Sequence, residues 1–373
     1  MTRTLWLALA LTALVSIAGA PPARASTMFT VTNLVTDDQS AHAAQIEDPG
    51  LVNPWGISYS TTSPFWVSDN GSGTSTIYNV APATNVTSKV GLTVTIPGAG
   101  SVTGQTFNGA ASQFNGDVFL FASEDGTISG WRGALGTAAE TLQGASADNV
   151  YKGAALGAVG GASYLYAANF KAATIDILKG TAAAANLTGN FTDPNLPSGY
   201  APFNIANLGG TLYVSYAVRD AGGTEDVAGP GNGIVDRYDL QGNLLGRLAT
   251  GGSLNSPWGL AIAPSSFGDF AGKLLVGNFG DGTISAYDST AGTFAGQLTD
   301  SNGDPIVIDG LWGLVPGNDG NAGSSGSIYF TAGPDGESHG LFGVISAVPE
   351  PATAVLVGMA LAPLALARRR RAA

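Results

Sequence analysis

The chain has 373 residues, of which 44% are hydrophobic and 11% charged, and it contains no cysteine. This composition excludes an intrinsically disordered chain, and it excludes thiol catalysis, thiolate metal sites and disulfides. The formal charge of −12 argues against a nucleic-acid partner, because a polyanion would be repelled. The 54 glycines stand in clusters between short apolar runs, and this pattern favours an all-β fold.

Residues 1–25 have the pattern of a secretory signal peptide. A positive charge is followed by a short apolar stretch, and Ala23 and Ala25 form an A-x-A cleavage site. Signal peptidase would therefore release a mature chain that begins at Ser26. A permanent N-terminal anchor is the alternative, and the short apolar stretch makes it less favoured.

One pattern recurs six times between residues 26 and 347. An aromatic residue leads a short apolar strand, and an alternating strand, a glycine-rich turn and another strand follow. The clearest copy is PWGLAIAP at 257–264 with KLLVGNFGDGTISAYD at 273–288. Successive leading aromatics are separated by roughly 44–55 residues, which is the size of a propeller blade. These aromatics are Trp55, Phe107, Tyr151, Phe203, Trp258 and Trp312.

Six copies predict a six-bladed β-propeller made of four-stranded antiparallel blades. A lone blade cannot bury both of its faces, whereas a closed ring lets each blade cover its neighbours. The strand FTVTNLV at 29–35 precedes the first copy, and we expect it to pair into the last blade and close the ring. The repeats resemble the NHL-like class of six-bladed propellers.

The central channel is the candidate ligand site, because we expect the leading aromatics to mark the same depth in each blade and polar residues stand close to them. Oxygen donors that converge from several blades would suit Ca²⁺. The arrangement resembles in principle the six-bladed lactonases of the gluconolactonase and paraoxonase type, which hold a divalent metal in the channel with Glu, Asn and Asp. No glutamate stands at the matching positions here, and the alternative is that these residues cap turns. The candidates are Asn53, Gln105, Asn108, Asn149, Lys152, Asn204, Asn255 and Asp309.

The sequence contains no established catalytic motif. Any Ser-His-Asp triad would need one of only two histidines, His42 and His339, and the turn-rich surroundings of His339 favour a structural residue. The segment 300–304 starts like a calcium loop but lacks its glycine and closing glutamate, so we expect a polar hairpin turn. The acidic insertion 219–233 has the composition of a binding loop or of a solvated one. The leading aromatics could stack on sugars, although such residues more often fill a core.

The C-terminal segment 348–373 resembles a PEP-CTERM sorting signal. Its residues are Val348, Pro349, Glu350 and Pro351, an apolar stretch at 352–367, and Arg368, Arg369, Arg370 and Arg371. The resemblance implies recognition by an exosortase, removal of the tail near the Pro-Glu-Pro motif, and transfer to the outer surface or an exopolysaccharide matrix. Until then the apolar stretch would span the membrane as a helix, with the arginines in the cytoplasm. A plain membrane anchor is the alternative.

Together with LVNPWGIS, GDGTISAYD and FTAGPDGESHGLFGVIS, this tail resembles a bacterial PEP-CTERM-associated propeller family that has no assigned activity. We therefore expect an exported, non-catalytic surface or matrix protein that binds an extracellular polysaccharide or protein. One alternative is a Ca²⁺-dependent hydrolase or lactonase with its site in the channel. Another is a purely structural matrix component.

Overall fold

The computed structural model describes residues 27–348. The predicted signal peptide 1–25, with Ala23, Ala25 and Ser26, lies outside the described residues. So do Pro349, Glu350, Pro351, the apolar stretch and the four arginines of the sorting tail. Among residues 27–348 no helix is long and apolar enough to cross a membrane.

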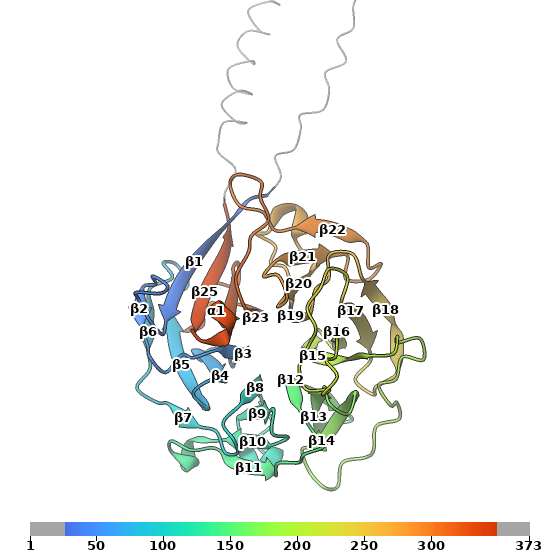
Figure 1. Cartoon of the computed structure of the whole chain (residues 1–373). Coiled ribbons are helices and arrows are strands. Elements are labelled where there is room, and N and C mark those ends of the chain that lie inside the picture. The colour runs from blue at the N-terminus through green and yellow to red at the C-terminus, as the bar shows by residue number, and fades with distance from the viewer. Residues whose placement is uncertain (1–26, 349–373) are drawn as a thin grey trace, which may run out of the picture.

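Six sheets surround one axis, which confirms the predicted six-bladed β-propeller (Figure 1), and their strands pair antiparallel except for β1 (Phe29–Thr36) with β2 (Ile46–Glu47). The first blade contains β3 (Pro54–Ser58), β4 (Phe65–Asp69), β5 (Thr74–Val80) and β6 (Thr87–Lys89), with β7 (Val94–Thr95) beside β5. The second contains β8 (Val102–Phe107), β9 (Phe119–Ser123), β10 (Ile128–Trp131) and β11 (Glu140–Gln143). The third contains β12 (Tyr151–Val159), β13 (Ala162–Asn169) and β14 (Thr174–Lys179).

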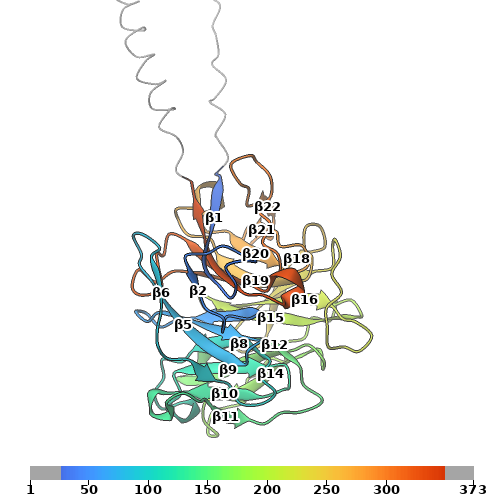
Figure 2. The same cartoon turned by 60° about the vertical axis from the view of Figure 1, so that its left-hand side comes forward.

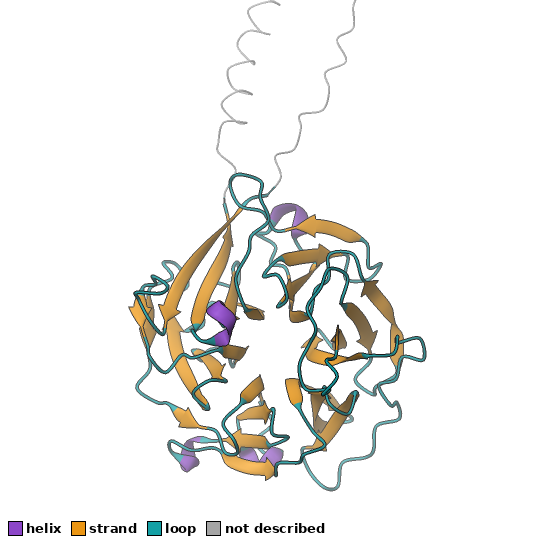
Figure 3. Ribbon diagram, viewed as in Figure 1, coloured by secondary structure: helices purple, strands orange, loops and turns teal. Residues whose placement is uncertain are grey.

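The fourth blade contains β15 (Tyr200–Leu208), β16 (Thr211–Val218), β17 (Ile234–Tyr238) and β18 (Leu244–Thr250). The fifth contains β19 (Pro257–Ile262), β20 (Leu274–Asn278), β21 (Ile284–Tyr287) and β22 (Phe294–Gln297). The sixth contains β23 (Leu311–Pro316), β24 (Ile328–Ala332), β25 (Leu341–Ala347), β1 (Phe29–Thr36) and β2 (Ile46–Glu47), and the short turn α1 (Pro334–Glu337) precedes β25. The strands radiate from the axis and α1 lies at the inner edge of its blade (Figure 3).

The third blade departs from the predicted four strands because it has three. Prolines and glycines in the segment 180–199 interrupt the extended backbone that a fourth strand would need. This segment instead follows the neighbouring fourth blade, where the Phe191 amide donates to the Gly242 carbonyl at 3.0 Å. The Phe191 ring packs against Tyr166 of β13 and Tyr238 of β17, so this segment contributes to the core between the third and fourth blades.

The ring closes as predicted, through the N-terminal strand. β1 pairs antiparallel with β25 from Phe29 opposite Ala347 to Thr36 opposite Leu341. The Val348 amide also donates to the Met28 carbonyl at 2.8 Å. Both ends of the described chain therefore leave the same rim of the sixth blade, as the two views show (Figures 1 and 2).

A glycine is the third residue of the innermost strand in five of the six blades, and these glycines are Gly56, Gly104, Gly153, Gly259 and Gly313. A Cβ atom on Gly56 would lie 2.4 Å from the Thr103 carbonyl oxygen of the next blade, and one on Gly104 would lie 2.3 Å from the Ala154 nitrogen. Glycine is needed here because the innermost strands approach each other closely around the axis. The recurring Trp-Gly pairs of the sequence therefore position the blades around the channel.

Candidate functional site

Four aromatic side chains close the central channel at one depth. Trp55, Phe203, Trp258 and Trp312 each lie at the β-bulge of their strand, directly after the first paired residue for the three tryptophans and after the third, Pro202, for Phe203. The Trp55 and Trp312 rings stack with centroids 3.5 Å apart, and the Trp258 ring meets them edge-on at 6.1 and 5.7 Å. All four are at least 95% buried. We call this group the axial layer, and it divides the channel into two separate depressions.

Two of the predicted leading aromatics do not belong to the axial layer. The strand register places Thr103 and Lys152 at the equivalent positions of the second and third blades. Tyr151 lies one residue earlier, and Phe107 lies at the far end of β8. The expectation of one common depth therefore holds for Trp55, Phe203, Trp258 and Trp312 and is wrong for Tyr151 and Phe107.

A cavity of about 380 Å³ lies on one side of the axial layer, toward the C-terminal ends of the innermost strands. We call it the axial cavity. All six blades line it, and its wall is mostly apolar, with aromatic rings from Tyr59, Phe107 and Trp258. Gln105 and Asn204 also line it, but their amide groups donate to Trp66 and Trp258 carbonyl oxygens, both at 2.8 Å. Its volume lies within the range of small-molecule sites, on the order of 300–1,000 Å³.

The other side of the axial layer carries charge, and we call it the charged mouth. Lys152 is 1% exposed, and its ammonium lies 5.3 Å from the centroid of the Trp55 ring. The same ammonium donates to Glu124 at 2.5 Å and to Glu225 at 3.1 Å. Burial alone would lower the pKa of Lys152, but attraction to Glu124 and Glu225 outweighs it and raises the pKa. Lys152 is therefore a permanent cation enclosed by two carboxylates.

Glu337 is the third carboxylate of the charged mouth. Burial raises its pKa, and the negative charges of Glu124 and Glu225 raise it further. Its Oε2 accepts a 2.6 Å hydrogen bond from the Asn53 amide, whose Oδ1 in turn accepts from the Trp312 indole at 3.0 Å. The hydrogen bond from Asn53 and the charge of Lys152 oppose the rise in pKa. The third carboxylate is thus tied to the axial layer through Asn53.

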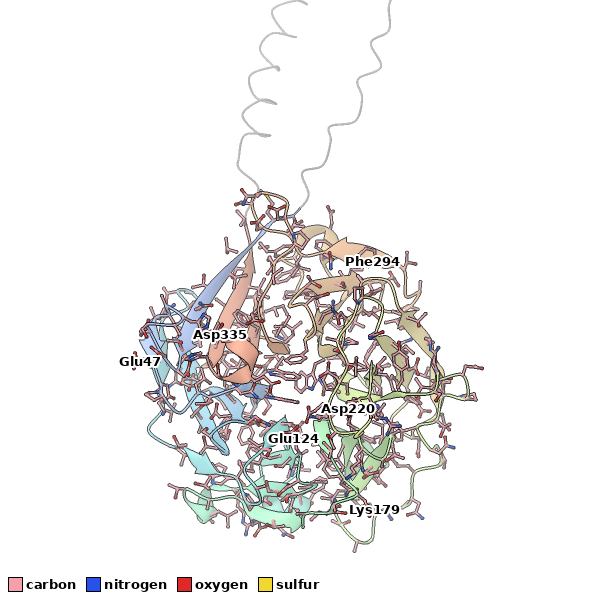
Figure 4. All side chains as sticks on the ribbon, in the orientation of Figure 1. Glu47, Glu124, Lys179, Asp220, Phe294 and Asp335 are labelled. Atoms are coloured by element: carbon pink, nitrogen blue, oxygen red, sulfur yellow. The ribbon has the colours of Figure 1, made fainter. Side chains whose placement is uncertain are left out.

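The three glutamates come from the turns between the second and third strands of their blades, whereas the predicted candidates flank the start of the innermost strands. Figure 4 shows Glu124 at the rim of the channel, with Asp220 and Asp335 on other sides of the same opening. Glu337 reaches the mouth through left-handed backbone, with φ of 56°, 64° and 66° at Asp335, Gly336 and Glu337. The run of glycine and acidic residues in GPDGESHG was the available sequence signal for this turn.

The structure brings only Asn53 and Lys152 of the eight predicted candidates into the charged mouth. Gln105 and Asn204 line the axial cavity, and Asn108 binds the Asp117 carbonyl at the far end of β8. The remaining three stabilise turns by accepting or donating hydrogen bonds: Asn149 with Tyr151 and Asn169, Asn255 with Gly229 and Asp281, and Asp309 with the Asp335 amide.

The described residues contain no group of three or more His, Asp or Glu side chains arranged to hold a metal ion. In the charged mouth the Lys152 ammonium lies between the carboxylates that a Ca²⁺ ion would need. At 300–304 the Asp300 carboxylate accepts hydrogen bonds from the Asn302 and Asp304 amides, as expected of a polar hairpin turn.

No family model matches the chain. Among solved structures, a streptogramin B lyase gives a TM-score of 0.49 at 13% identity and covers 86% of this chain and 98% of its own. A glucose dehydrogenase gives a TM-score of 0.49 at 12% identity and covers 86% and 100%.

Two relatives are uncharacterised proteins of Acanthamoeba polyphaga mimivirus. One is 30% identical over 347 residues, which covers 87% of this chain and 82% of the relative. The other is 29% identical over 345 residues, which covers 86% and 87%. Both are viral, so the bacterial source expected from the sorting tail stays a prediction. The chain belongs to the same family as the first of these mimivirus proteins.

Proposed function

We propose that this protein is an exported binding propeller that takes a saccharide unit of an extracellular polysaccharide into its axial cavity. The observation that carries the proposal is the axial layer, because it closes the channel at one end and leaves a cavity of about 380 Å³ walled by every blade. A closed concavity buries more of a ligand's surface than an open tunnel does, and affinity depends on that burial.

The chemistry of the wall suits a sugar ring. Tyr59, Phe107 and Trp258 offer aromatic surface, on which the apolar face of a sugar can pack. The innermost strand of each blade has no neighbour on its axial side, so backbone N–H and C=O groups along that edge are available to hydroxyl groups. The Trp55 indole N–H is buried without an acceptor among the described residues, but Trp55 does not line the axial cavity, so this donor is not counted among the groups that a ligand there would meet.

Export and sorting form the second part of the proposal. Signal peptidase would cut before Ser26, and an exosortase-type transpeptidase would remove the tail near Pro349-Glu350-Pro351, leaving the body at the outer surface or in an exopolysaccharide matrix. The position of the two described chain ends supports both cleavages. Because Met28 and Val348 pair at one rim, both cuts would fall just outside the closed ring and would remove no strand.

An oligosaccharide array tests the ligand. We expect the mature protein to bind a subset of glucose-, galactose-, mannose- or N-acetylglucosamine-terminated oligosaccharides, and Ala206→Trp to abolish that binding by filling the axial cavity. Ala158→Trp is the matched control, because Ala158 is exposed on β12 and does not line the cavity. Silence across the array, or equal binding by both variants, would exclude a saccharide site in the cavity.

Mass spectrometry of the surface-associated protein tests the sorting. We expect a C-terminus near Pro349-Glu350-Pro351 in a host that encodes an exosortase, and an intact tail in a host from which that enzyme is deleted. An intact tail in both hosts would support the plain anchor. The result is independent of the oligosaccharide array, so the two parts of the proposal can fail separately.

A Ca²⁺-dependent hydrolase or lactonase is the second candidate function. The observation that favours it is the group of three glutamates at the charged mouth, because the sequence offered no glutamate near the leading aromatics. Ca²⁺ would have to displace the Lys152 ammonium from Glu124 and Glu225 and then polarise a lactone carbonyl. Calorimetric titration with Ca²⁺ and an assay on simple lactones test it. The absence of both Ca²⁺ binding and turnover would remove this candidate.

A further inference from the structure

The only two histidines of the chain lie next to each other, although 297 positions separate them. His42 is in the connection between β1 and β2, and His339 is in the connection between α1 and β25. Their ring centroids are 5.8 Å apart, with the planes at 74°. Both side chains are about one quarter exposed, at 26% and 27%, so solvent reaches them.

Each imidazole is oriented by a carboxylate. His42 Nε2 is 2.9 Å from Asp335 Oδ2, and His339 Nδ1 is 3.0 Å from Asp37 Oδ2. An ionised carboxylate only accepts hydrogen bonds, so the nitrogen beside it carries the proton in the neutral imidazole. The lone pair then lies on the opposite nitrogen, Nδ1 of His42 and Nε2 of His339. Neither of these nitrogens has a hydrogen-bond partner among the described residues.

In zinc sites a histidine binds the ion through one ring nitrogen and donates the N–H of the other to a carboxylate. His42 and His339 each have such a carboxylate on one nitrogen and, within residues 27–348, no partner on the other. With zinc–nitrogen bonds of about 2.0–2.1 Å and a tetrahedral angle at the ion, two imidazoles that share a zinc ion have ring centroids about 5.2 Å apart. The observed separation of 5.8 Å is about 0.6 Å longer, so a small rotation of one of the two partly exposed imidazoles would bring the rings to that distance. We propose that His42 and His339 bind one divalent transition-metal ion, with Asp335 and Asp37 as positioning residues and water in the remaining coordination positions.

Such an ion would lie at the closure of the ring. The segments that carry the histidines follow β1 and precede β25, the two strands that join the ends of the chain. They are already held together by the Asp37 amide on the Gly340 carbonyl at 3.2 Å and by the Gly340 amide on the Asp37 carboxylate at 2.9 Å. A metal bridge would reinforce this junction and stabilise the closed propeller. The inference does not depend on the ligand of the axial cavity or on sorting.

Two neutral imidazoles select among metals. Imidazole nitrogen suits Zn²⁺, Cu²⁺ and Ni²⁺, whereas Ca²⁺ and Mg²⁺ require oxygen ligands. We therefore expect binding by the first three ions and none by the last two. The chain offers an unusually clear test, because no other imidazole and no thiol is present in the sequence.

The experiment is a Zn²⁺ titration of the mature protein, purified with a histidine-free tag and followed by calorimetry and thermal unfolding. We expect one ion per chain and a saturable rise in Tm of about 4 °C at a free concentration of 100 times Kd. Cu²⁺ electron paramagnetic resonance should show coupling to two nitrogen nuclei. An ion that raised Tm without binding the two imidazoles would not produce this coupling.

His42→Gln and His339→Gln should each abolish the rise in Tm and leave at most one coupled nitrogen. Glu47→Gln is the matched control. It changes a carboxylate of β2, the strand that follows the connection carrying His42, without changing either imidazole, and it should bind Zn²⁺ as the unaltered protein does. Asp335→Asn should weaken Zn²⁺ binding, because it loosens the orientation of His42. Equal Zn²⁺ binding by the double variant His42→Gln/His339→Gln, or no binding by the unaltered protein, would overturn the proposal.

Discussion

Replacing Lys152 with methionine tests the electrostatics of the charged mouth. Lys152→Met keeps the length of the side chain but removes the cation that lies between Glu124 and Glu225. Removing one partner of a buried ion pair costs about 3–5 kcal/mol. Because the Glu225 side chain is 67% exposed, it can turn to solvent and contributes little to this cost. The Glu124 side chain is 24% exposed, so we expect a loss of stability near the lower limit, about 3 kcal/mol.

The pH dependence of this loss distinguishes charge from packing. Without Lys152, the pKa of Glu337 should rise further, since Lys152 now lowers it. A carboxyl with a raised pKa in the folded state binds more protons than in the unfolded state, so stability falls as pH rises through that range. The destabilisation by Lys152→Met should therefore be largest at pH 7–8 and smaller near pH 5. Urea unfolding at the two pH values measures the difference.

The control is Lys179→Met, because Lys179 is only half-buried, lies on the outer circumference and donates to an Asn186 amide oxygen and to no carboxylate among the described residues (Figure 4). It should change stability by less than about 0.5 kcal/mol. A double-mutant cycle with Glu124→Gln should return a favourable coupling energy between Lys152 and Glu124. A loss that is equal at both pH values, or a coupling energy near zero, would refute the electrostatic account and leave only packing.

Three further predictions concern the axis and one buried carboxyl. Trp312→Ala should cost about 3–5 kcal/mol in urea unfolding, because the ring stacks on Trp55; a smaller cost would mean that the layer is not a packing unit. Gly56→Ala should destabilise by about 2 kcal/mol or more, whereas Gly91→Ala, with no atom within 4 Å of its Cβ, should be nearly neutral. Burial raises the pKa of Asp236 to about 7, so stability from this group is lost as pH rises toward 7. Asp236→Asn should therefore stabilise the protein more at pH 8 than at pH 5, and an equal effect at both pH values would contradict the raised pKa.

The blade number and the ring closure could be predicted because both follow from repeated local patterns. Six aromatic-led strands at similar spacing required six sheets, and the free strand at 29–35 had only the last blade left to pair with. The three-stranded third blade was not predictable in this way. The segment 180–199 follows the fourth blade instead of forming a fourth strand, and no local pattern indicates the tertiary contact of Phe191 that holds it there.

The axial register was mispredicted in two blades because the aromatic residue was taken as the marker. In the structure the better marker is the glycine that follows, since the close approach of neighbouring blades needs it at nearly every axial position. Thr103 precedes Gly104 and Lys152 precedes Gly153, so the glycines would have given the register in both blades. The fourth blade has Asn204 instead, and its amide donates to the Trp258 carbonyl across the blade boundary.

The glutamates of the charged mouth and the histidine pair could not be predicted, because each depends on contacts between distant segments. Glu124, Glu225 and Glu337 belong to three different blades and meet only after the ring has closed. Glu337 also needs a left-handed backbone at a residue that is not glycine, which sequence patterns do not indicate. A search for carboxylates beside the leading aromatics therefore missed Glu124 and Glu337, whereas Glu225 lies in the acidic insertion 219–233 that had the composition of a binding or a solvated loop.

Lys152 is the residue that makes the two sides of the axial layer differ. An aromatic or aliphatic side chain at this position would extend the layer without the cost of burying a charge, and such replacements of buried ion pairs are often neutral or stabilising. Stability alone therefore does not account for a lysine at 1% exposure. Its ammonium holds Glu124 and Glu225 over the axis and lies on the Trp55 ring, whose indole donor has no partner. Lys152 therefore joins the carboxylates of the charged mouth to the axial layer, and this placement of the charge is what the lysine adds beyond stability.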